Sequence, residues 1–383
     1  MHYRFYGGMV MRAACWIALW LCAVFAAAHA AAQEASQPLY VKFGGQVRDE
    51  DRVIAAASSR GQPLKVLEER DESVRVQLND GAGWISRIDV GTREEVLKDA
   101  SQRIANEPDN VELRLFRLEL LSPTSASDQN QALADLEHVI QLAPQDPRGY
   151  FLRGSLRAKT RQFDAAIDDF SQCLKLDPKL AAALLERGMA YYALREFDIA
   201  LDDLNAYVKL EGESAEGLAA RGMARVELQK YAQAEADFAQ AIKLDNQLAL
   251  PWFERARMWM RRHNAPAAVS DLSETLKRNP QHLDATIFLA TLLACGPDDS
   301  PRDGKRAIDL ATIACRLAGE SDFRPVEALA AAYAEAGDFA KAVEQQEKAL
   351  ALLAKAKAPE GAKNAARYRL SHYKASQPVR LMR

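Results

Sequence analysis

The sequence has few of the residues that build metal centres and covalent active sites. It holds 6 histidines and 5 cysteines in 383 residues. No Cys-x-x-Cys, His-x-x-x-His or His-Glu-x-x-His occurs, so the ligand spacings of common zinc sites are absent. No Gly-x-Ser-x-Gly occurs either, and this motif marks the nucleophile of many serine hydrolases. We therefore expect a protein that is not an enzyme, with no catalytic residues, no metal site and no cofactor.

An excess of one charge sign is also missing. The chain has 50 Lys and Arg against 53 Asp and Glu, which gives a net charge of -3. A broad nucleic-acid-binding surface is therefore not expected, because such surfaces are strongly basic. Cys173, Cys295 and Cys315 follow the first thirty residues, and an odd number cannot form a complete disulfide framework. We expect Cys173 to be a small core residue, and Cys295 and Cys315 to lie too far apart for a bridge.

Acidic residues are absent from the first thirty positions, which have the order of an export signal. Arg4 and Arg12 supply the basic end, 13–27 is the apolar run, and Ala28-His29-Ala30 is a small-x-small cleavage site. The run is shorter than the roughly 20 apolar residues of a membrane-spanning helix. We expect residues 1–30 to be a signal peptide and the protein to be exported, to the periplasm or the extracellular space. An uncleaved signal is the one expected route to a membrane.

What the chain does have is a period of 34 residues. Helix-breaking residues recur at this spacing: Pro144, Pro178, Gly212, Asn246 and Pro280. One column of small residues recurs with it: Gly154, Gly188, Gly222 and Ala256. A second small column follows: Ala132, Ala166, Ala200, Ala234 and Ala268. A period of this length is that of a helix–turn–helix solenoid, whose units bury their apolar faces only by stacking.

The columns have the residue types that close helix packing requires. Gly188 and Ala200 leave room for two antiparallel helices, and Leu204 one turn later fills the seam to the next unit. The pattern resembles the tetratricopeptide repeat (TPR) family in its aromatic, Gly, Tyr, Ala, Phe and Pro landmarks. The resemblance implies a mainly α protein with about seven helical hairpins over residues 111–356, regular at 147–180, 181–214, 215–248 and 249–282. We expect 359–375 to form a C-terminal capping helix.

Residues 38–90 have a different pattern. Leu64-Lys65-Val66-Leu67 and Val74 to Leu78 alternate as β-strands do, and Asn79-Asp80-Gly81 is a hairpin turn signal. About five short strands in this span predict a small barrel. With Gly61 and Gly83-Trp84-Ile85, the segment resembles a bacterial SH3-like domain. Trp84 either fills the core, which we favour, or belongs to a ligand surface. Residues 92–107 are expected to form a connecting helix with Thr92 as its N-cap.

Two charged columns also keep the 34-residue period. The basic column is Arg153, Arg187, Arg221 and Arg255. The acidic column is Asp169, Asp203, Asp237 and Asp271. Antiparallel helices would set the two columns opposite each other, so we predict Arg–Asp pairs that join the two helices of each hairpin. A role in packing is favoured over a role in ligand binding.

The family resemblance implies a function as well as a fold. In TPR proteins the first helices of the hairpins line a concave groove that binds peptides or partner helices. Groove residues are expected on the face beside the core columns, and they are Phe151, Leu185, Met189, Tyr192, Met223, Val226, Phe253, Arg257, Met260, Arg261 and Ile287. The favoured hypothesis is a non-enzymatic scaffold that binds a protein or peptide in this groove.

Three alternatives to that hypothesis stay open. In the first alternative, the array's own packing buries the apolar stripe. In the second, the stripe is buried by self-association, in a structural envelope protein that assembles from copies of itself. The third alternative is an accessory module that recruits a cell-wall enzyme, with the β-domain touching peptidoglycan.

Overall fold

The structure, a computed structural model, describes residues 39–42, 46–49, 52–56, 63–70, 72–78, 81–122, 124–297 and 301–381. The chain divides after Thr160 into two compact units. The first unit holds the β-strands and helices α2 to α5, and the second holds helices α6 to α17. The expected signal peptide, residues 1–30, lies outside the described residues.

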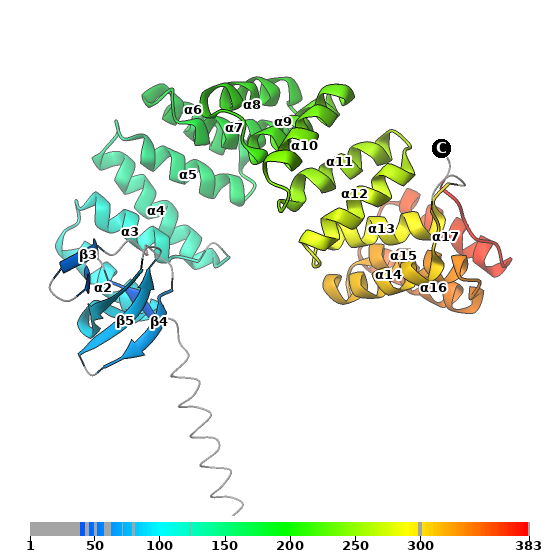
Figure 1. The fold of residues 1–383 in the computed structure, drawn as a ribbon, viewed down its shortest axis with the longest axis horizontal. Helices are drawn as coiled ribbons and strands as arrows, with labels where there is room; N and C mark the ends of the chain where they lie inside the picture. Colours follow the sequence, from blue (N-terminus) through cyan, green and yellow to red (C-terminus); the bar gives the residue numbers. More distant parts are fainter. Residues whose placement is uncertain are drawn as a thin grey trace, which may run out of the picture. The chain divides into compact units, whose positions relative to one another are not determined.

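The described residues before α2 form seven short β-strands, some of which are labelled in Figure 1. They form one five-stranded antiparallel sheet of order β3-β2-β6-β5-β4 and a two-stranded ladder of β1 with β7. The strands are β1 (Leu39–Val41), β2 (Gln46–Asp49), β3 (Arg52–Ala56), β4 (Lys65–Glu69), β5 (Ser73–Leu78), β6 (Gly81–Ser86) and β7 (Val90–Thr92).

The closed barrel expected for this region is not confirmed. Among the described strands no ladder joins the edge strands β3 and β4. One isolated bridge, between Leu39 and Leu64, links the β1–β7 ladder to the residue before β4. Gly61, Asn79 and Asp80 of the expected motif lie outside the described residues. The described strands therefore form two sheets, which this bridge links.

Six residues form the apolar core of the β region: Val41, Leu64, Val74, Val76, Ile85 and Val90. The expectation that Trp84 also fills this core is wrong, because Trp84 is only half-buried. Successive side chains of a strand point to opposite faces, and it is the next residue, Ile85, that points inward with 1% of its surface exposed. The guanidinium of Arg70 lies 4.0 Å from the centre of the Trp84 ring on the other face.

Helix α2 (Arg93–Asn106) begins with the expected cap at Thr92. The Thr92 side chain accepts a hydrogen bond from the Glu95 amide at 3.3 Å, and the Glu95 carboxylate accepts one from the Thr92 amide at 2.8 Å. This reciprocal capping box satisfies two amides that a helix start leaves unpaired. Helices α3 (Val111–Leu120), α4 (Ala126–Leu142) and α5 (Pro147–Lys159) complete the helical part of the first unit.

The second unit is entirely helical in its described residues. Its helices follow one another as antiparallel neighbours (Figure 1). They are α6 (Phe163–Leu176), α7 (Ala181–Ala193), α8 (Phe197–Glu211), α9 (Ala215–Glu227), α10 (Tyr231–Leu244), α11 (Ala249–Arg261), α12 (Ala265–Arg278), α13 (Leu283–Cys295), α14 (Gly304–Ala318), α15 (Phe323–Glu335), α16 (Phe339–Lys355) and α17 (Glu360–Lys374). Helices α7, α9, α11 and α13 start 34 residues apart, as the sequence period predicts.

The turn inside each regular hairpin uses a residue with a left-handed backbone. Such residues have φ between 57° and 66° and recur every 34 residues, at Arg161, Arg195, Gln229 and His263. None of them is glycine, although the left-handed region carries a steric cost for residues with a Cβ atom. The left-handed turn therefore recurs with the sequence period although glycine, the residue that adopts this backbone conformation most easily, does not occupy it.

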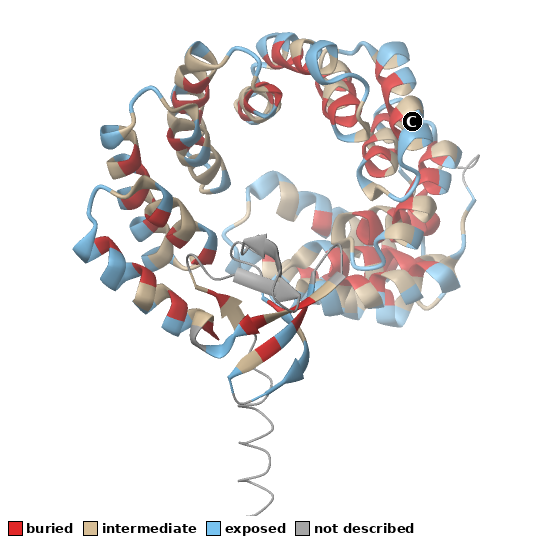
Figure 2. Ribbon diagram, turned by 60° about the vertical axis from the view of Figure 1, so that its left-hand side comes forward, coloured by how far each residue is buried: buried red, intermediate tan, exposed pale blue. Residues whose placement is uncertain are grey.

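The small-residue columns lie where neighbouring helices approach most closely. A Cβ atom added to Gly188 on α7 would lie 3.0 Å from Cγ of Leu204 on α8, and one added to Gly222 on α9 would lie 2.7 Å from the Phe238 ring on α10. Ala200, Leu204 and Phe238 have no exposed surface. Buried residues accordingly form stripes along the helix faces that meet their neighbours (Figure 2).

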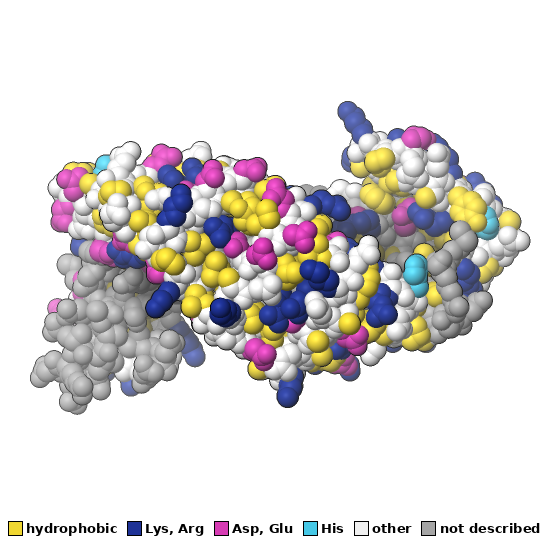
Figure 3. Space-filling view, turned by 90° about the horizontal axis from the view of Figure 1, so that it is seen from above, with side chains coloured by type: hydrophobic (Ala, Val, Ile, Leu, Met, Phe, Trp, Pro, Cys, Tyr) yellow, Lys and Arg dark blue, Asp and Glu magenta, His cyan; other side chains and the backbone are white. Residues whose placement is uncertain are grey.

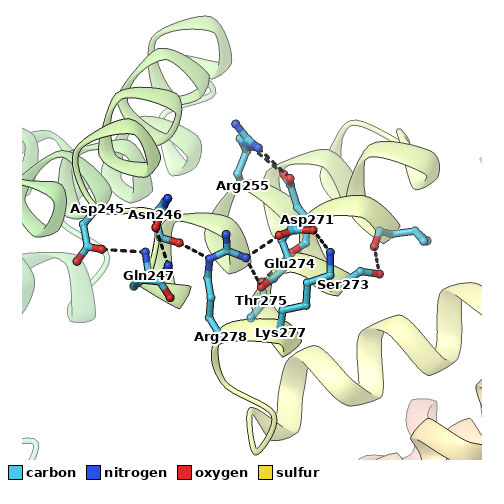
Figure 4. A network of polar contacts seen from close by, with 11 residues as sticks. Asp245, Asn246, Gln247, Arg255, Asp271, Ser273, Glu274, Thr275, Lys277 and Arg278 are labelled. Carbon is cyan, nitrogen blue, oxygen red and sulfur yellow. Dashed lines mark hydrogen bonds and ion pairs between the residues drawn. The ribbon is translucent and has the colours of Figure 1, made fainter.

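Three of the predicted Arg–Asp pairs form within the second unit. In Arg187–Asp203, Arg221–Asp237 and Arg255–Asp271, Nε of the Arg donates to one carboxylate oxygen and Nη2 to the other, at 2.7–3.1 Å. Figure 4 shows the third pair beside Arg278, which donates to Glu274 and to the backbone oxygen of Asn246. Each Asp is buried, so the pairs join the two helices of a hairpin from inside.

The first hairpin, α3 with α4, makes an equivalent contact outside the period. Asp135 is 1% exposed and takes bonds from two residues, Arg114 at 3.1 Å and Arg117 at 2.5 and 2.8 Å. Arg117 precedes Asp135 by 18 residues, whereas the three regular pairs are separated by 16. The acidic column therefore extends into the first hairpin, while its basic partner is displaced by two residues.

The chain end packs back onto the last helices. Tyr373 on α17 is 1% exposed and joins the core formed with Ala330, Ala334 and Ala342. Beyond α17, the Leu381 amide donates to the Cys295 backbone oxygen at 2.7 Å, and Arg380 pairs with Glu335 at 2.6 Å. The described residues after the last helix therefore cover the end of α13.

The described cysteines are unpaired. Cys173 is fully buried, which confirms its expected place in the core, and burial raises the pKa of its thiol to about 11. Burial also raises the pKa of Cys295 to about 11. Within the described part of the chain, no helix has the length and apolarity to cross a membrane.

Candidate functional site

The predicted groove residues lie on the first helices of successive hairpins. Phe151 is on α5 in the first unit. The others are in the second unit and are distributed over four helices: Leu185, Met189 and Tyr192 on α7, Met223 and Val226 on α9, Phe253, Arg257, Met260 and Arg261 on α11, and Ile287 on α13.

Much of the apolar part of this set is used for packing. Val226, Phe253 and Ile287 are 6–7% exposed and belong to the core between helices. Leu185, Met189 and Tyr192 are half-buried against the core cluster of Leu201, Leu204, Ala220 and Ala224. Met223 and Met260 are half-buried in the same way against neighbouring core clusters. The buried three offer almost no surface to a partner, which agrees with the alternative in which the array's own packing buries the stripe.

A charged cluster lies beside these residues and joins three first helices. The Glu227 carboxylate on α9 accepts a hydrogen bond from Arg261 on α11 at 2.7 Å. The same oxygen accepts one from the Tyr192 hydroxyl on α7 at 3.3 Å. With Glu254 and Arg257 on α11, these residues form what we call the first-helix cluster.

Glu254 and Arg257 form the second contact of the cluster. One terminal nitrogen of Arg257 donates to both Glu254 oxygens, at 2.8 and 3.0 Å. Glu254 is 8% exposed, whereas the Arg257 side chain is 35% exposed and its guanidinium lies 6.0 Å from the Phe253 ring centre. The carboxylate is therefore a buried anchor that leaves part of the guanidinium at the surface.

The surroundings shift the pKa values of the cluster in different directions. The hydrogen bond from Arg261 is the largest cause that lowers the pKa of Glu227. Burial raises the pKa of Glu254 against the opposing effect of Arg257. Burial, followed by the charge of Glu227, raises the pKa of Tyr192 to about 12. At neutral pH the hydroxyl of Tyr192 is therefore a proton donor and Glu227 an ionised acceptor.

The exposed parts of the cluster suit recognition of a polar chain. Arg257 and Arg261 lie one turn apart on α11, and residues at this spacing share a helix face. The Arg261 side chain is 40% exposed, and one of its nitrogens is bound to Glu227. Guanidinium groups present several donors in a fixed plane, which suits carboxylates and backbone oxygens. Methionines beside them adapt to different apolar contacts.

Sequence reasoning identified the arginines of the cluster but missed its acids. Glu227 and Arg261 occupy the same position in consecutive hairpins, 34 residues apart, with opposite charges. A search for the same residue type at every 34th position does not detect such a pair, because its two members differ. Glu254 gave no signal, because its burial depends on how α11 packs against its neighbours.

On the face drawn in Figure 3, basic, acidic and hydrophobic side chains are interspersed. Among the residues that the structure describes, no group of three or more His, Cys, Asp or Glu side chains is placed to hold a metal ion. The geometry thus defines a class of protein, a stacked helical-hairpin solenoid whose polar clusters lie between helices and along their faces.

Comparison with known proteins identifies the kind of helical repeat in part of the chain. Family models described as tetratricopeptide repeat match residues 124–185 and 185–249. Residues 124–249 are therefore tetratricopeptide repeats, which confirms the resemblance read from the sequence. Neither of these models describes a catalytic family. The comparison with curated proteins gives no match.

Solved structures of low sequence identity share the fold. A chain of the APC/C hetero-tetramer Cut9–Hcn1 is 15% identical with a TM-score of 0.55, and the match covers 73% of this chain and 52% of that chain. Yeast Tom70 is 16% identical with a TM-score of 0.52, and the match covers 74% of this chain and 59% of that chain. The present chain thus matches a little over half of each of these proteins.

Proposed function

We propose that this protein is a non-enzymatic scaffold that binds a protein or peptide partner on the first helices of its second unit. One observation carries the proposal, namely the first-helix cluster, which places two partly exposed guanidinium groups beside half-buried methionines. Interfaces between proteins are enriched in Arg, Tyr and Met, the residue types that gather here. The tetratricopeptide repeats of residues 124–249 support a scaffold role.

The contact surface that we propose is narrower than the expected groove set. Arg257, Arg261, Met189 and Tyr192 keep exposed surface and would touch the partner. Val226, Phe253 and Ile287 would act through packing, because they are buried. Recognition would combine hydrogen bonds from the guanidinium groups to a polar backbone with apolar contacts to Met189.

We further propose that the protein works after export, in the periplasm or the extracellular space, on the basis of residues 1–30. Residues 38–90 are proposed to be an SH3-like module. The Leu39–Leu64 bridge supports this proposal, as does the core in which Val41 and Val90 of the ladder cluster with Val74, Val76 and Ile85 of the five-stranded sheet. Cooperative thermal unfolding of a fragment with these bounds is the expected result, and a fragment without a transition would contradict it.

A cross-linked capture from the organism's envelope extract tests the scaffold function. The variant is Arg257→Ala with Arg261→Glu, which removes both guanidinium groups of the cluster from the surface. The matched control is Lys243→Glu on α10, an exposed lysine with no interaction among the described residues. Circular dichroism establishes that all three proteins are folded.

Partners captured by the wild type and the control, and lost by the double variant, would support binding at the cluster. Equal capture by all three would place the function elsewhere in the molecule. Capture of the protein's own copies alone, with a mass on light scattering that rises with concentration, would favour the self-assembling structural protein.

A further inference from the structure

The first unit contains a cavity of about 220 Å³ that the proposed contact surface does not use. Helices α3, α4 and α5 line it, and all of its lining residues lie before Thr160. Five leucines supply its apolar wall: Leu118, Leu121, Leu136, Leu152 and Leu156. Leu152 is 37% exposed, so part of this wall is open to solvent. The cavity is thus an apolar hollow that opens to the surface.

A polar network fixes the mouth of this cavity. Arg93 on α2 donates to the Leu120 backbone oxygen and to the Asp128 carboxylate, each at 2.6 Å. The Ser122 amide donates to the same carboxylate at 2.8 Å. These contacts, led by the Ser122 amide, lower the pKa of Asp128. The backbone at Leu120 and Ser122 and the side chain of Asp128 are therefore held in place before any ligand arrives, which reduces the entropy lost on binding.

The charges at the mouth are unequal. Asp128 is ionised and neutralised by Arg93. Lys159, at the end of α5, also lines the cavity, is exposed, and has no ion-pair partner among the described residues. An uncompensated ammonium group therefore stands at the rim of an apolar hollow, where it favours a ligand that carries a negative charge beside its apolar part.

The volume indicates which kind of ligand fits. Pockets for small molecules and cofactors measure roughly 300–1,000 Å³. A hollow of about 220 Å³ is smaller than that range, and it suits one large side chain rather than a complete small molecule. An occupant that is part of a longer chain can fill the hollow with one residue and place its neighbour against Lys159.

We propose that this cavity is a second protein-binding site, which takes one leucine or phenylalanine side chain from a peptide segment whose next residue is Asp or Glu. The five leucines enclose the apolar side chain, and Lys159 pairs with the adjacent carboxylate. The site is independent of the first-helix cluster, since it lies wholly in the other unit.

The test uses the full chain and a peptide array on a Gly-Ser host decapeptide. The arrayed dipeptides combine Leu, Phe or Ala with Asp, Lys or Ser at the centre of the host. The protein variants are Ser155→Leu, which fills the cavity from its own wall, and Lys159→Glu, which reverses the rim charge. Lys98→Glu is the matched control, because Lys98 is an exposed lysine on α2 with no interaction among the described residues.

The wild type and Lys98→Glu are expected to retain Leu-Asp and Phe-Asp peptides above Ala-Asp and above the host alone. Lys159→Glu should weaken Asp-containing peptides about two- to fivefold and move the preference toward Lys. Ser155→Leu should lose the Leu and Phe preference while keeping the thermal midpoint of a folded chain. Wild-type binding that ignores the apolar residue, or an Asp preference that survives Lys159→Glu, would overturn the proposal.

Discussion

The Arg–Asp pairs and the first-helix cluster use the same residue types, but they differ in repetition and in exposure. The pairs recur every 34 residues, and their Arg side chains are 17–22% exposed. The contacts of the cluster occur once each, and its Arg side chains are 35% and 40% exposed. A charge that obeys the period serves the packing common to every hairpin. A charged residue that does not recur with the period is not needed for this common packing, so it can serve a function specific to this protein, such as binding a partner.

The largest effect is expected where a repeated pair is broken from one side. Asp203→Ala leaves the Arg187 guanidinium between two helices without its carboxylate, and we expect a loss of about 3–5 kcal/mol in the free energy of unfolding. Urea unfolding followed by circular dichroism measures this loss. The control is Arg187→Met with Asp203→Leu, which should cost less because no charge is left stranded. Equal losses in the single and the double variant would mean that the pair does not couple the helices.

A smaller effect is expected at the close approach of α9 and α10. Gly222→Ala would place a methyl group 2.7 Å from the Phe238 ring, so we expect a loss of about 1–3 kcal/mol from overpacking. Gly361→Ala on α17 is the matched control, because nothing lies within 4 Å of the added methyl group. That control should gain stability by up to about 1 kcal/mol, from the higher helix propensity of alanine. Losses of similar size in both variants would contradict the packing role of the small column.

The Arg187–Asp203 pair and Gly222 show why the fold could be predicted from the sequence. Gly222 and the pair of Arg187 with Asp203 repeat in the chain because stacked hairpins need the same spacing and the same contacts in every unit. The displaced contact of Arg117 with Asp135 could not be predicted, because α3 is shorter and its turn is longer than those of the regular hairpins. The closed barrel was not confirmed, because a strand pattern gives the strands but not which edges pair.

The candidate sites were predicted less completely, for a related physical reason. Arg257 and Arg261 followed from the expected helix face, but the burial of Phe253 did not, because it depends on contacts with later helices. Glu227 was missed because its partner is in the next hairpin. The mouth of the cavity beside Lys159 depends on the bond from Arg93 to Asp128, which is a contact across 35 residues that no local pattern contains.

The two acids of the cluster should depend on pH in opposite ways. The pKa of Glu227 is lowered in the folded state, so its contribution to stability is present above the ordinary value of 4.5 and is lost as the pH falls through the folded value. The pKa of Glu254 is raised, so the folded state loses stability as the pH rises from 4.5 through the folded value. These signs follow from which state binds the proton more tightly.

Urea unfolding of Glu227→Gln and Glu254→Gln between pH 3 and pH 8, each compared with the wild type, measures this opposition. Glu227→Gln should be less stable than the wild type at neutral pH, with a deficit that shrinks below pH 4.5. Glu254→Gln should become more stable relative to the wild type as the pH rises. The two variants serve as controls for each other, since both replace a carboxylate by an amide on a first helix. Parallel pH profiles would contradict the difference in burial.

The smallest effect on stability is expected where the cluster meets solvent, at Arg261→Ala. The Arg261 side chain is 40% exposed and Tyr192 still donates to Glu227 after the change, so the loss should be only about 0–1 kcal/mol. Affinity for the captured partner should nevertheless fall at least about tenfold, because exposed arginines at an interface centre carry much of the binding energy. The control is Arg324→Ala, which breaks surface ion pairs with Asp284 at 2.8 Å and with Asp322 at 2.7 Å, and it should leave partner affinity unchanged and cost no more stability than Arg261→Ala. A loss of stability like that of Asp203→Ala, or unchanged partner affinity, would place Arg261 with the packing charges and remove the distinction drawn between the two groups.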